Sequence, residues 1–299
     1  MNKTIENQYL KVEVSSKGAE LQSIFHKQMG KEILWQGEKE FWNRRSPILF
    51  PNVGRHYENY YLYKGKKYDT VQHGFARDME FSCVEEKEDT LVYRLQDTQD
   101  TRAYFPYAFS LDITYCLKEN TLEVNWKVKN PNEETMYFTI GGHPGFNVPI
   151  LENTAQTDYK LLFRGREHLG YHLVHGMEGT ADKDKTYTLS LEPVGEFQGC
   201  AVTEHMFDKD ALIFDDSQID WVAIGYPDGT PYVAMKCQGF TNFGIWSLPH
   251  APYICLEPWM GRCDDYGFSG EISEKPDVIA LKAKDTFNHS YEIAVYEKK

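Results

Sequence analysis

Two alternating segments joined by a short polar loop constrain the fold of this chain most. In residues 109–117 (FSLDITYCL) every second side chain is apolar, and residues 122–128 (LEVNWKV) repeat the pattern after the loop KENT. Such alternation places the apolar side chains on one face of a strand. We therefore predict an antiparallel hairpin with one buried face.

The same pattern recurs along the chain, while helical periodicity is hard to find. Residues 221–226 and 232–237 flank PDGT, which has the residues of a tight turn. Only residues 152–160 and 203–209 are expected to hold a turn or two of helix. Many short strands without a fixed repeat or a linker predict an all-β antiparallel sandwich with few short helices. We expect one domain over residues 1–299.

Charge and cysteine usage limit the partners and the compartment. A net charge of −13 argues against nucleic acid or an anionic membrane as the main partner. The N-terminus lacks the apolar core of a signal peptide, and no stretch approaches the roughly 18 apolar residues of a membrane span. The six cysteines show no CxxC motif, which favours buried free thiols in a reducing, cytoplasmic setting.

The segment GGHPGF (141–146) mounts a histidine between glycines and a proline, after a strand-like run. Pro144 disfavours the helical conformation at His143 and removes the next backbone donor. The glycines leave room around the ring and allow backbone angles closed to other residues. One imidazole would thus be held stiffly at a strand end. The alternative is a tight turn whose histidine has no chemical role.

Glu257 is the only charged residue between Tyr253 and Gly261. A carboxylate in so apolar a strand must be paired, hydrogen-bonded or raised in pKa. A glutamate of this kind suits a general base near neutral pH. The alternative is a structural glutamate bonded to backbone amides or to an arginine.

Other polar positions lie beside Gly or Pro at predicted strand edges. They are Arg55, His73, Arg77 and the aspartates between 208 and 216. Alone, Arg77 fits a surface cation, and the aspartates fit a mostly solvated turn; together with His143 and Glu257 the set indicates a site. The chain has no GxSxG, HExxH, GxGxxG or GxxxxGK[ST] motif, so we expect no serine triad, no metal and no phosphate-binding loop.

Six segments carry a resemblance to a known family. They are PILFPNVGR, HGFAR, GGHPGF, DALIFDD, FGIWS and LEPWMG, spanning residues 47–261. In this order they resemble the aldose 1-epimerase (galactose mutarotase) family, above all its LacX-like bacterial branch. Flanking strands extend the likeness over nearly the whole chain. The resemblance implies a β-supersandwich with the sugar in an open cleft, and neither a metal nor an organic cofactor.

The resemblance also implies roles for individual residues. The catalytic base of the family falls on Glu257, and its catalytic acid falls on His143. The aspartate that holds the substrate falls on Asp210, or on Asp208 if the register shifts by two. GGHPGF replaces the asparagine and histidine neighbourhood of classical galactose mutarotases, which leaves the preferred sugar open.

Two arginines raise the question of a phosphorylated substrate. His73 matches the second active-site histidine of the family, and Arg55 matches the arginine that reaches the sugar hydroxyls. In the related hexose-6-phosphate epimerases, an arginine in a similar HGFAR segment binds phosphate with an upstream arginine. Arg77 and Arg55 match that pair, and paired guanidinium groups suit phosphate. A free aldose is our first expectation, and a hexose 6-phosphate is the second.

The sequence therefore predicts an isomerase that interconverts the α and β anomers of a hexose. Trp35, Phe75 and Trp259 are candidates for stacking on the sugar, with core packing as their alternative. A carbohydrate-binding module would need such aromatics but no acid–base pair, whereas a glycoside hydrolase would need two carboxylates. We expect a small sugar as the only partner class, and a monomer or homodimer.

Overall fold

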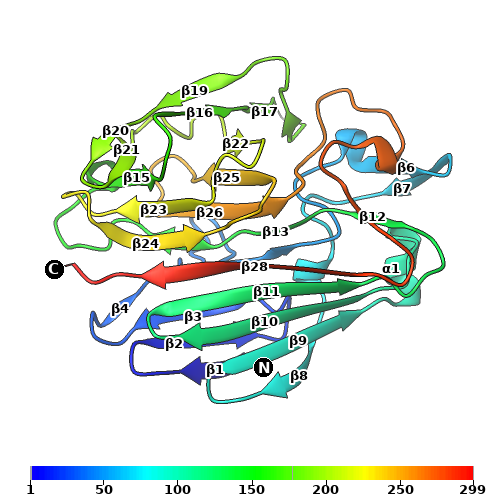
Figure 1. Cartoon of the computed structure of the whole chain (residues 1–299), viewed down its shortest axis with the longest axis horizontal. Helices are drawn as coiled ribbons and strands as arrows, with labels where there is room; N and C mark the ends of the chain where they lie inside the picture. Colours follow the sequence, from blue (N-terminus) through cyan, green and yellow to red (C-terminus); the bar gives the residue numbers. More distant parts are fainter. Residues whose placement is uncertain (1, 177, 299) are drawn as a thin grey trace.

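The computed structural model describes residues 2–176 and 178–298. Its largest element is a ten-stranded antiparallel sheet, within which β28 joins the two halves of the molecule in Figure 1. The order of its strands is β20 (Glu192–Val194), β21 (Phe197–Ala201), β15 (Lys160–Phe163), β23 (Trp221–Gly225), β24 (Pro231–Lys236), β28 (Thr286–Val295), β11 (Thr121–Lys129), β10 (Ser110–Lys118), β9 (Thr90–Gln96) and β8 (Ser82–Glu86).

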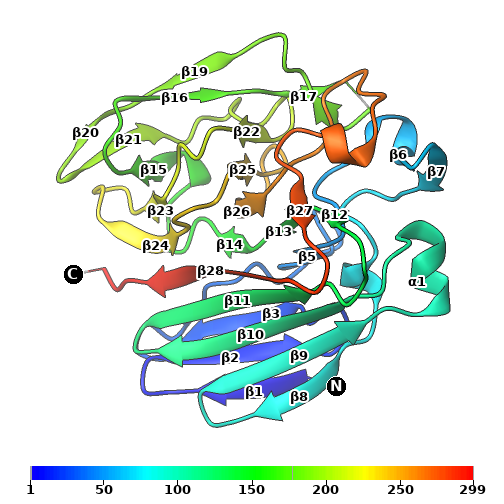
Figure 2. The ribbon, with the colours of Figure 1, turned by 45° about the vertical axis from the view of Figure 1, so that its right-hand side comes forward.

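Two further sheets accompany the ten-stranded sheet. One has four strands: β1 (Asn2–Glu6), β2 (Leu10–Ser15), β3 (Leu21–His26) and β4 (Lys31–Glu32). The other contains β22 (Leu212–Phe214), β25 (Asn242–Trp246), β26 (Tyr253–Met260), β13 (Ile140–Gly142), β5 (Ile48–Leu49) and β14 (Gly145–Asn147), of which β14 pairs with β26. The four-stranded sheet lies behind β8–β11 in Figures 1 and 2. Hydroxyl groups of Tyr93 and Tyr115 tie the two together by bonding the carbonyls of Val14 and Ala19.

Short elements complete the chain. The two-stranded ribbons are β6 (Tyr60–Tyr63) with β7 (Lys66–Asp69), β12 (Met136–Phe138) with β27 (Ile279–Leu281), β16 (His168–Tyr171) with β19 (Tyr187–Ser190), and β17 (Val174–His175) with β18 (Thr180–Ala181). The helices are α1 (Gln99–Tyr104) and the 3₁₀ turns η1 (Tyr57–Asn59), η2 (Ala76–Asp78), η3 (Gln156–Asp158) and η4 (Ile272–Glu274). In the described part of the chain, no helix is both long and apolar enough to cross a membrane.

Both predicted hairpins are confirmed. Strands β10 and β11 pair with Leu117 opposite Leu122, and the alternating apolar positions of both are buried. Strands β23 and β24 pair around PDGT. Of the two segments expected to contain helical turns, 152–160 contains η3, whereas 203–209 forms turns without a helix. The helix α1 was not predicted; the side chain of Thr98 caps it by accepting a hydrogen bond from the Thr101 amide.

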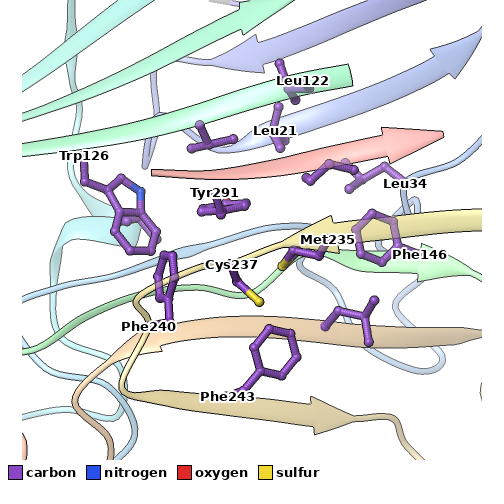
Figure 3. Packing of buried hydrophobic residues seen from close by; sticks show 14 of the residues in the cluster. Leu21, Leu34, Leu122, Trp126, Phe146, Met235, Cys237, Phe240, Phe243 and Tyr291 are labelled. Carbon is purple, nitrogen blue, oxygen red and sulfur yellow. The ribbon is translucent and has the colours of Figure 1, made fainter. Parts of the chain in front are cut away.

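One hydrophobic core runs through the molecule, with members from Ile5 to Val295. Figure 3 shows its centre, where aromatic rings from three segments interlock. The indole of Trp126 meets the rings of Tyr291 and Phe240 edge-on, with centroids 5.4 and 5.8 Å apart. Residues from both ends of the chain thus share one core, as expected for one large antiparallel β-supersandwich. The predicted all-β fold class is confirmed.

The cysteines depart from the prediction in one respect. All six are free, as expected, but three of them are only half-buried, namely Cys83, Cys116 and Cys200. Cys83 and Cys200 pack against the core from the partly exposed strands β8 and β21. Cys116 lies between the buried Tyr115 and Leu117 on β10, so its side chain points to the opposite face of the sheet.

Candidate active site

A cavity of about 280 Å³ brings together most of the predicted site residues. Its lining includes His73, Arg77, His143, Asp210 and Glu257. These residues come from four separate stretches of chain, which meet because the strands of the six-stranded sheet pair across long sequence distances. Concave sites with a few convergent polar groups are the usual place for small-molecule chemistry.

Strand pairing sets His143 against Glu257. Strand β26 carries Glu257 and pairs with both β13 and β14, and His143 lies in the bend between those two strands. Nε2 of His143 is therefore 3.2 Å from Oε2 of Glu257. An imidazole and a carboxyl group at this distance can exchange a proton with each other or with a ligand that contacts both.

The glycines around His143 serve close packing rather than unusual backbone angles. None of Gly141, Gly142 and Gly145 has a positive φ, which corrects the expectation from the sequence. A Cβ on Gly141 would instead lie 2.5 Å from the Trp259 indole, and one on Gly244 would lie 2.3 Å from the same ring. Glycine at both positions lets the Trp259 ring lie against the strand backbones, where it forms part of the cavity wall.

The His143–Glu257 pair is almost fully buried, with 7% and 1% of these residues exposed. Burial raises the pKa of Glu257 well above its usual value, and the charge of Asp210 adds to the effect. Burial also lowers the pKa of His143 to about 3. Burial thus disfavours the charged form of both groups and favours a protonated carboxyl group beside a neutral imidazole. Nδ1 of His143 has no hydrogen-bond partner among the described residues.

His73 is oriented as a neutral hydrogen-bond donor. The amide of Gly54 donates to its Nδ1 over 3.1 Å, so the ring proton resides on Nε2. Its pKa lies well below the usual value because of burial, then because of His143 and the nearby arginines. Its backbone is left-handed, with φ of 66°, a conformation seen more often at functional sites than elsewhere.

The two predicted arginines occupy different places. Arg77 lines the cavity, and its Nη2 donates to the carbonyl of Gln72 over 2.7 Å. Burial, with the charge of Arg44, lowers its pKa to about 10, so it remains a cation at neutral pH. Arg55 is not one of the residues that line the cavity; it donates hydrogen bonds to the side chains of Asn59 and Gln72, and Gln72 lines the cavity. Contact between Arg55 and a sugar stays a prediction.

The structure separates the two candidate aspartates. Asp210 lines the cavity and has a left-handed backbone, with φ of 70°. Asp208 lies in the adjoining groove, where its carboxylate is 2.9 Å from His205. The geometry therefore favours Asp210 as the residue that faces a ligand in the cavity.

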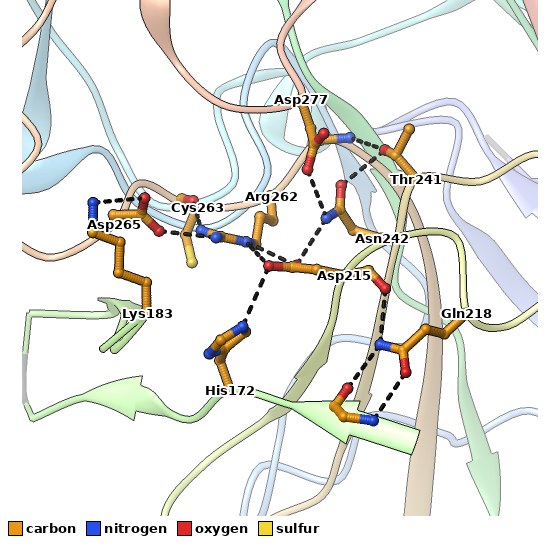
Figure 4. A network of polar contacts seen from close by, with 12 residues as sticks. His172, Lys183, Asp215, Gln218, Thr241, Asn242, Arg262, Cys263, Asp265 and Asp277 are labelled. Carbon is orange, nitrogen blue, oxygen red and sulfur yellow. Dashed lines mark hydrogen bonds and ion pairs between the residues drawn. The ribbon is translucent and has the colours of Figure 1, made fainter. Parts of the chain in front are cut away.

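Asp215 departs from the expectation of a mostly solvated aspartate run. Arg262 is 6% exposed at its side chain and binds both carboxylate oxygens of Asp215, at 2.9 and 3.0 Å (Figure 4). Arg262 also reaches Asp265, whose carboxylate faces Lys183. This network fixes the segment that includes Cys263, a lining residue, against the strands around the cavity.

Two tryptophans that the sequence did not single out also line the cavity. Trp42 and Trp246 have ring centroids 4.8 and 5.6 Å from that of His143. Of the aromatics proposed for stacking, Trp259 lines the cavity, whereas Trp35 is buried in a cluster with Tyr253. Phe75 borders a separate, mostly apolar cavity of about 150 Å³.

Comparison with known proteins identifies the family. A sequence profile described as Aldose 1-epimerase matches residues 2–169, which is more than half of the chain. The chain belongs to the aldose 1-epimerase family. The matched region of this family member includes His143 and ends before Asp210 and Glu257, so the profile says nothing about those two positions.

Individual relatives agree over nearly the full length. Protein LacX (plasmid) from Lactococcus lactis subsp. lactis is 28% identical over 299 residues, covering 97% of this aldose epimerase family member and 98% of that protein. A galactose mutarotase related enzyme from Lactobacillus acidophilus has a TM-score of 0.92 and 30% identity over 99% of this chain and 98% of its own. A galactose mutarotase-like protein from Lactobacillus casei has a TM-score of 0.89 and 28% identity over 99% and 100% of the two chains. The predicted family and fold are confirmed.

Proposed function

We propose that this protein is an aldose 1-epimerase that interconverts the α and β anomers of a free hexose. The observation that carries the proposal is the contact of 3.2 Å between His143 and Glu257 at the wall of the cavity. Anomer interconversion needs one base for the C1 hydroxyl and one acid for the ring oxygen, and it needs nothing else. A buried imidazole–carboxyl pair supplies both.

The reaction proceeds by opening and closing of the sugar ring. The Glu257 carboxylate accepts the proton of the C1 hydroxyl, while the His143 imidazolium donates a proton to the ring oxygen. The bond between C1 and the ring oxygen breaks and leaves a free aldehyde. After rotation about the C1–C2 bond, the ring closes on the other face of the carbonyl and both protons return. Atoms and charge balance over the cycle.

Burial of the pair favours the ring-opened stage. Once the ring has opened, Glu257 is protonated and His143 is neutral, which is the protonation state that burial favours in the free protein. The charged pair needed with the closed sugar is disfavoured by the same desolvation. The pair therefore gains stability as the ring opens, and each group contributes a rate factor on the order of 10²–10⁴.

The other lining residues suit a sugar. Nε2 of His73 can donate a hydrogen bond to a hydroxyl, and the carboxylate of Asp210 can accept one. The indoles of Trp246 and Trp259 offer flat apolar faces for the C–H groups of a pyranose. Contacts of this kind keep the reacting atoms aligned with the acid–base pair.

Polarimetry on freshly dissolved α-glucose and α-galactose tests the proposal. We expect the protein to accelerate the approach to anomeric equilibrium for at least one of these sugars. Calorimetric binding of the same sugars without acceleration would instead indicate a carbohydrate-binding role. Release of nitrophenol from nitrophenyl glycosides would indicate a hydrolase. Either result would overturn the proposal.

A hexose 6-phosphate is the second candidate, favoured by the cationic side chain of Arg77 at the cavity. Its buried Nε has no hydrogen-bond partner among the described residues and lies 3.9 Å from Asp78. A charge-assisted hydrogen bond to phosphate contributes about 1.5–3 kcal/mol, or roughly 10–150-fold in binding. If the substrate is phosphorylated, Arg77→Ala should lower kcat/KM for glucose 6-phosphate by that factor more than for glucose. Polarimetry with both sugars measures the difference.

The matched control for this substitution is Arg102→Ala. Arg102 lies on α1, is half exposed and pairs with Asp97 outside the cavity lining. We expect Arg102→Ala to leave turnover of both sugars unchanged. An equal loss for glucose and glucose 6-phosphate in Arg77→Ala would count against the phosphate and leave the free hexose as substrate.

A further inference from the structure

Three potential metal ligands meet at the wall of the cavity. His143, Cys255 and Glu257 each offer one donor atom, and the three atoms lie within 4.8 Å of one another. Cys255 and Glu257 are two residues apart on β26 and therefore project from the same face of that strand. Strand β14 pairs with β26 so that Gly145 faces Cys255, which brings the neighbouring His143 over the thiol.

The side chains of this cluster are buried, and one of their polar atoms lacks a hydrogen-bond partner. Cys255 is fully buried, and Glu257 is 1% exposed. Within residues 2–176 and 178–298, Nδ1 of His143 has no hydrogen-bond partner, and Oε2 of Glu257 has a polar contact only with Nε2 of His143, at 3.2 Å. Polar atoms buried without partners are costly and uncommon, and they are usually explained by a ligand, an ion or a catalytic role.

The chemistry of the donors selects the cation. One imidazole nitrogen, one cysteine sulfur and one carboxyl oxygen suit zinc, whereas magnesium and calcium prefer oxygen donors only. The thiol of Cys255 and the carboxyl group of Glu257 would release their protons to solvent as the ion binds. Three protein ligands leave a fourth position of a tetrahedral site open to water. Zinc lies about 2.0–2.3 Å from its ligands, so the three side chains need to close in slightly around it. The cavity bordered by His143 and Glu257 gives the ion a path inward.

We propose that His143, Cys255 and Glu257 form an inhibitory binding site for Zn²⁺. The inference that Zn²⁺ binds is drawn from the geometry of the cluster. The inference that it inhibits rests on the proposed function, because the ion would be coordinated by both residues of the acid–base pair. Cys255 has no part in the proposed reaction, so it distinguishes the metal site from the catalytic pair.

Calorimetric titration of the metal-free protein with Zn²⁺ tests the site directly. We expect one ion per chain, and Cys255→Ala should weaken binding on the order of 10²-fold or more, since outer-shell changes alone weaken metal sites about 10–100-fold. Co²⁺ in place of Zn²⁺ should give a sulfur-to-cobalt charge-transfer band in the wild type that is absent in Cys255→Ala. The matched control is Cys263→Ala, because Cys263 is also buried and borders the cavity but lies outside the cluster. It should bind Zn²⁺ like the wild type.

Polarimetry provides the second readout. Zn²⁺ should inhibit the wild type and Cys263→Ala, while Cys255→Ala should keep its basal rate and resist Zn²⁺. No Zn²⁺ binding by the wild type, or equal binding by Cys255→Ala, would overturn the proposal. If Cys255→Ala does not fold, Cys255→Ser and the cobalt spectrum of the wild type decide the matter. If the wild type lacks mutarotase activity, the proposed function is wrong. The zinc titration and the cobalt spectrum still test the metal site, because neither measurement depends on activity.

Discussion

Glu257→Gln should lower kcat for anomer interconversion by about 10²–10⁴-fold while leaving KM within a few fold of the wild type. Glutamine has nearly the same size, so it fits a position that is 1% exposed, but its amide cannot take the proton of the C1 hydroxyl. The substitution also removes the carboxyl group that faces His143 at 3.2 Å. Polarimetry over a range of sugar concentrations separates kcat from KM.

The control for this loss is Glu123→Gln. Glu123 also lies on a strand, β11, but its carboxylate pairs with Lys118 far from the cavity lining, so turnover should not change. A rate for Glu257→Gln within a few fold of the wild type would rule out Glu257 as the base. Unfolding of Glu257→Gln, detected by circular dichroism, would indicate the structural role that the sequence analysis gave as the alternative. Glu257→Asp keeps the carboxyl group on a shorter side chain, so it would then test whether the charge or the position of the group matters.

Local pattern predicted the strands well because alternation is a short-range signal. The hairpin of β10 and β11 has the predicted buried face, since Leu117 and Leu122 adjoin the turn and set the register. The same reasoning missed α1, because its stability comes from the capping of Thr98 and Thr101 rather than from an apolar stripe. A six-residue helix has too few turns to reveal a period.

The site was harder to predict because its parts come from strands far apart in the chain. No short sequence pattern indicates that Glu257 and His143 are in contact, because they meet only through the pairing of β26 with β13 and β14. The resemblance to a family supplied that link. Trp246 lay within the quoted segment FGIWS without a role, and Trp42 lies in an irregular stretch where no periodicity marks it. The proposed zinc ligands could not be predicted from the sequence either. Cys255 and Glu257 share a strand, but His143 comes from a distant part of the chain.

Lys275→Met should lower the free energy of unfolding by about 3–5 kcal/mol at neutral pH, because it leaves a buried carboxylate without its cation. Nζ of Lys275 is 2.6 Å from Asp264, and both side chains are 2% exposed. Asp264 also accepts a hydrogen bond from the Tyr57 amide and faces His56. Its backbone bonds to Arg55, so the ion pair ties together segments that border the cavity. Urea unfolding followed by tryptophan fluorescence measures the loss.

The dependence of this loss on pH identifies its cause. Burial alone would raise the pKa of Asp264, but Lys275 and then His56 outweigh burial, and the pKa lies below its usual value. The stability that Asp264 contributes is therefore present above about pH 4 and declines as the pH falls further. Without Lys275, burial should raise this pKa, so the variant gains stability on acidification and the difference from the wild type should narrow toward pH 4.

Two companion variants separate charge from packing. Lys284→Met removes an exposed lysine that pairs with Glu133, and it should change the free energy of unfolding by less than about 1 kcal/mol. Asp264→Asn combined with Lys275→Met removes the stranded charge and should recover part of the loss. If Lys275→Met is as stable as the wild type, or if its deficit is the same at pH 4 and pH 7, the buried ion pair does not hold this side of the cavity. The segments around Tyr57 and Asp264 would then be held by their backbone hydrogen bonds and apolar packing alone.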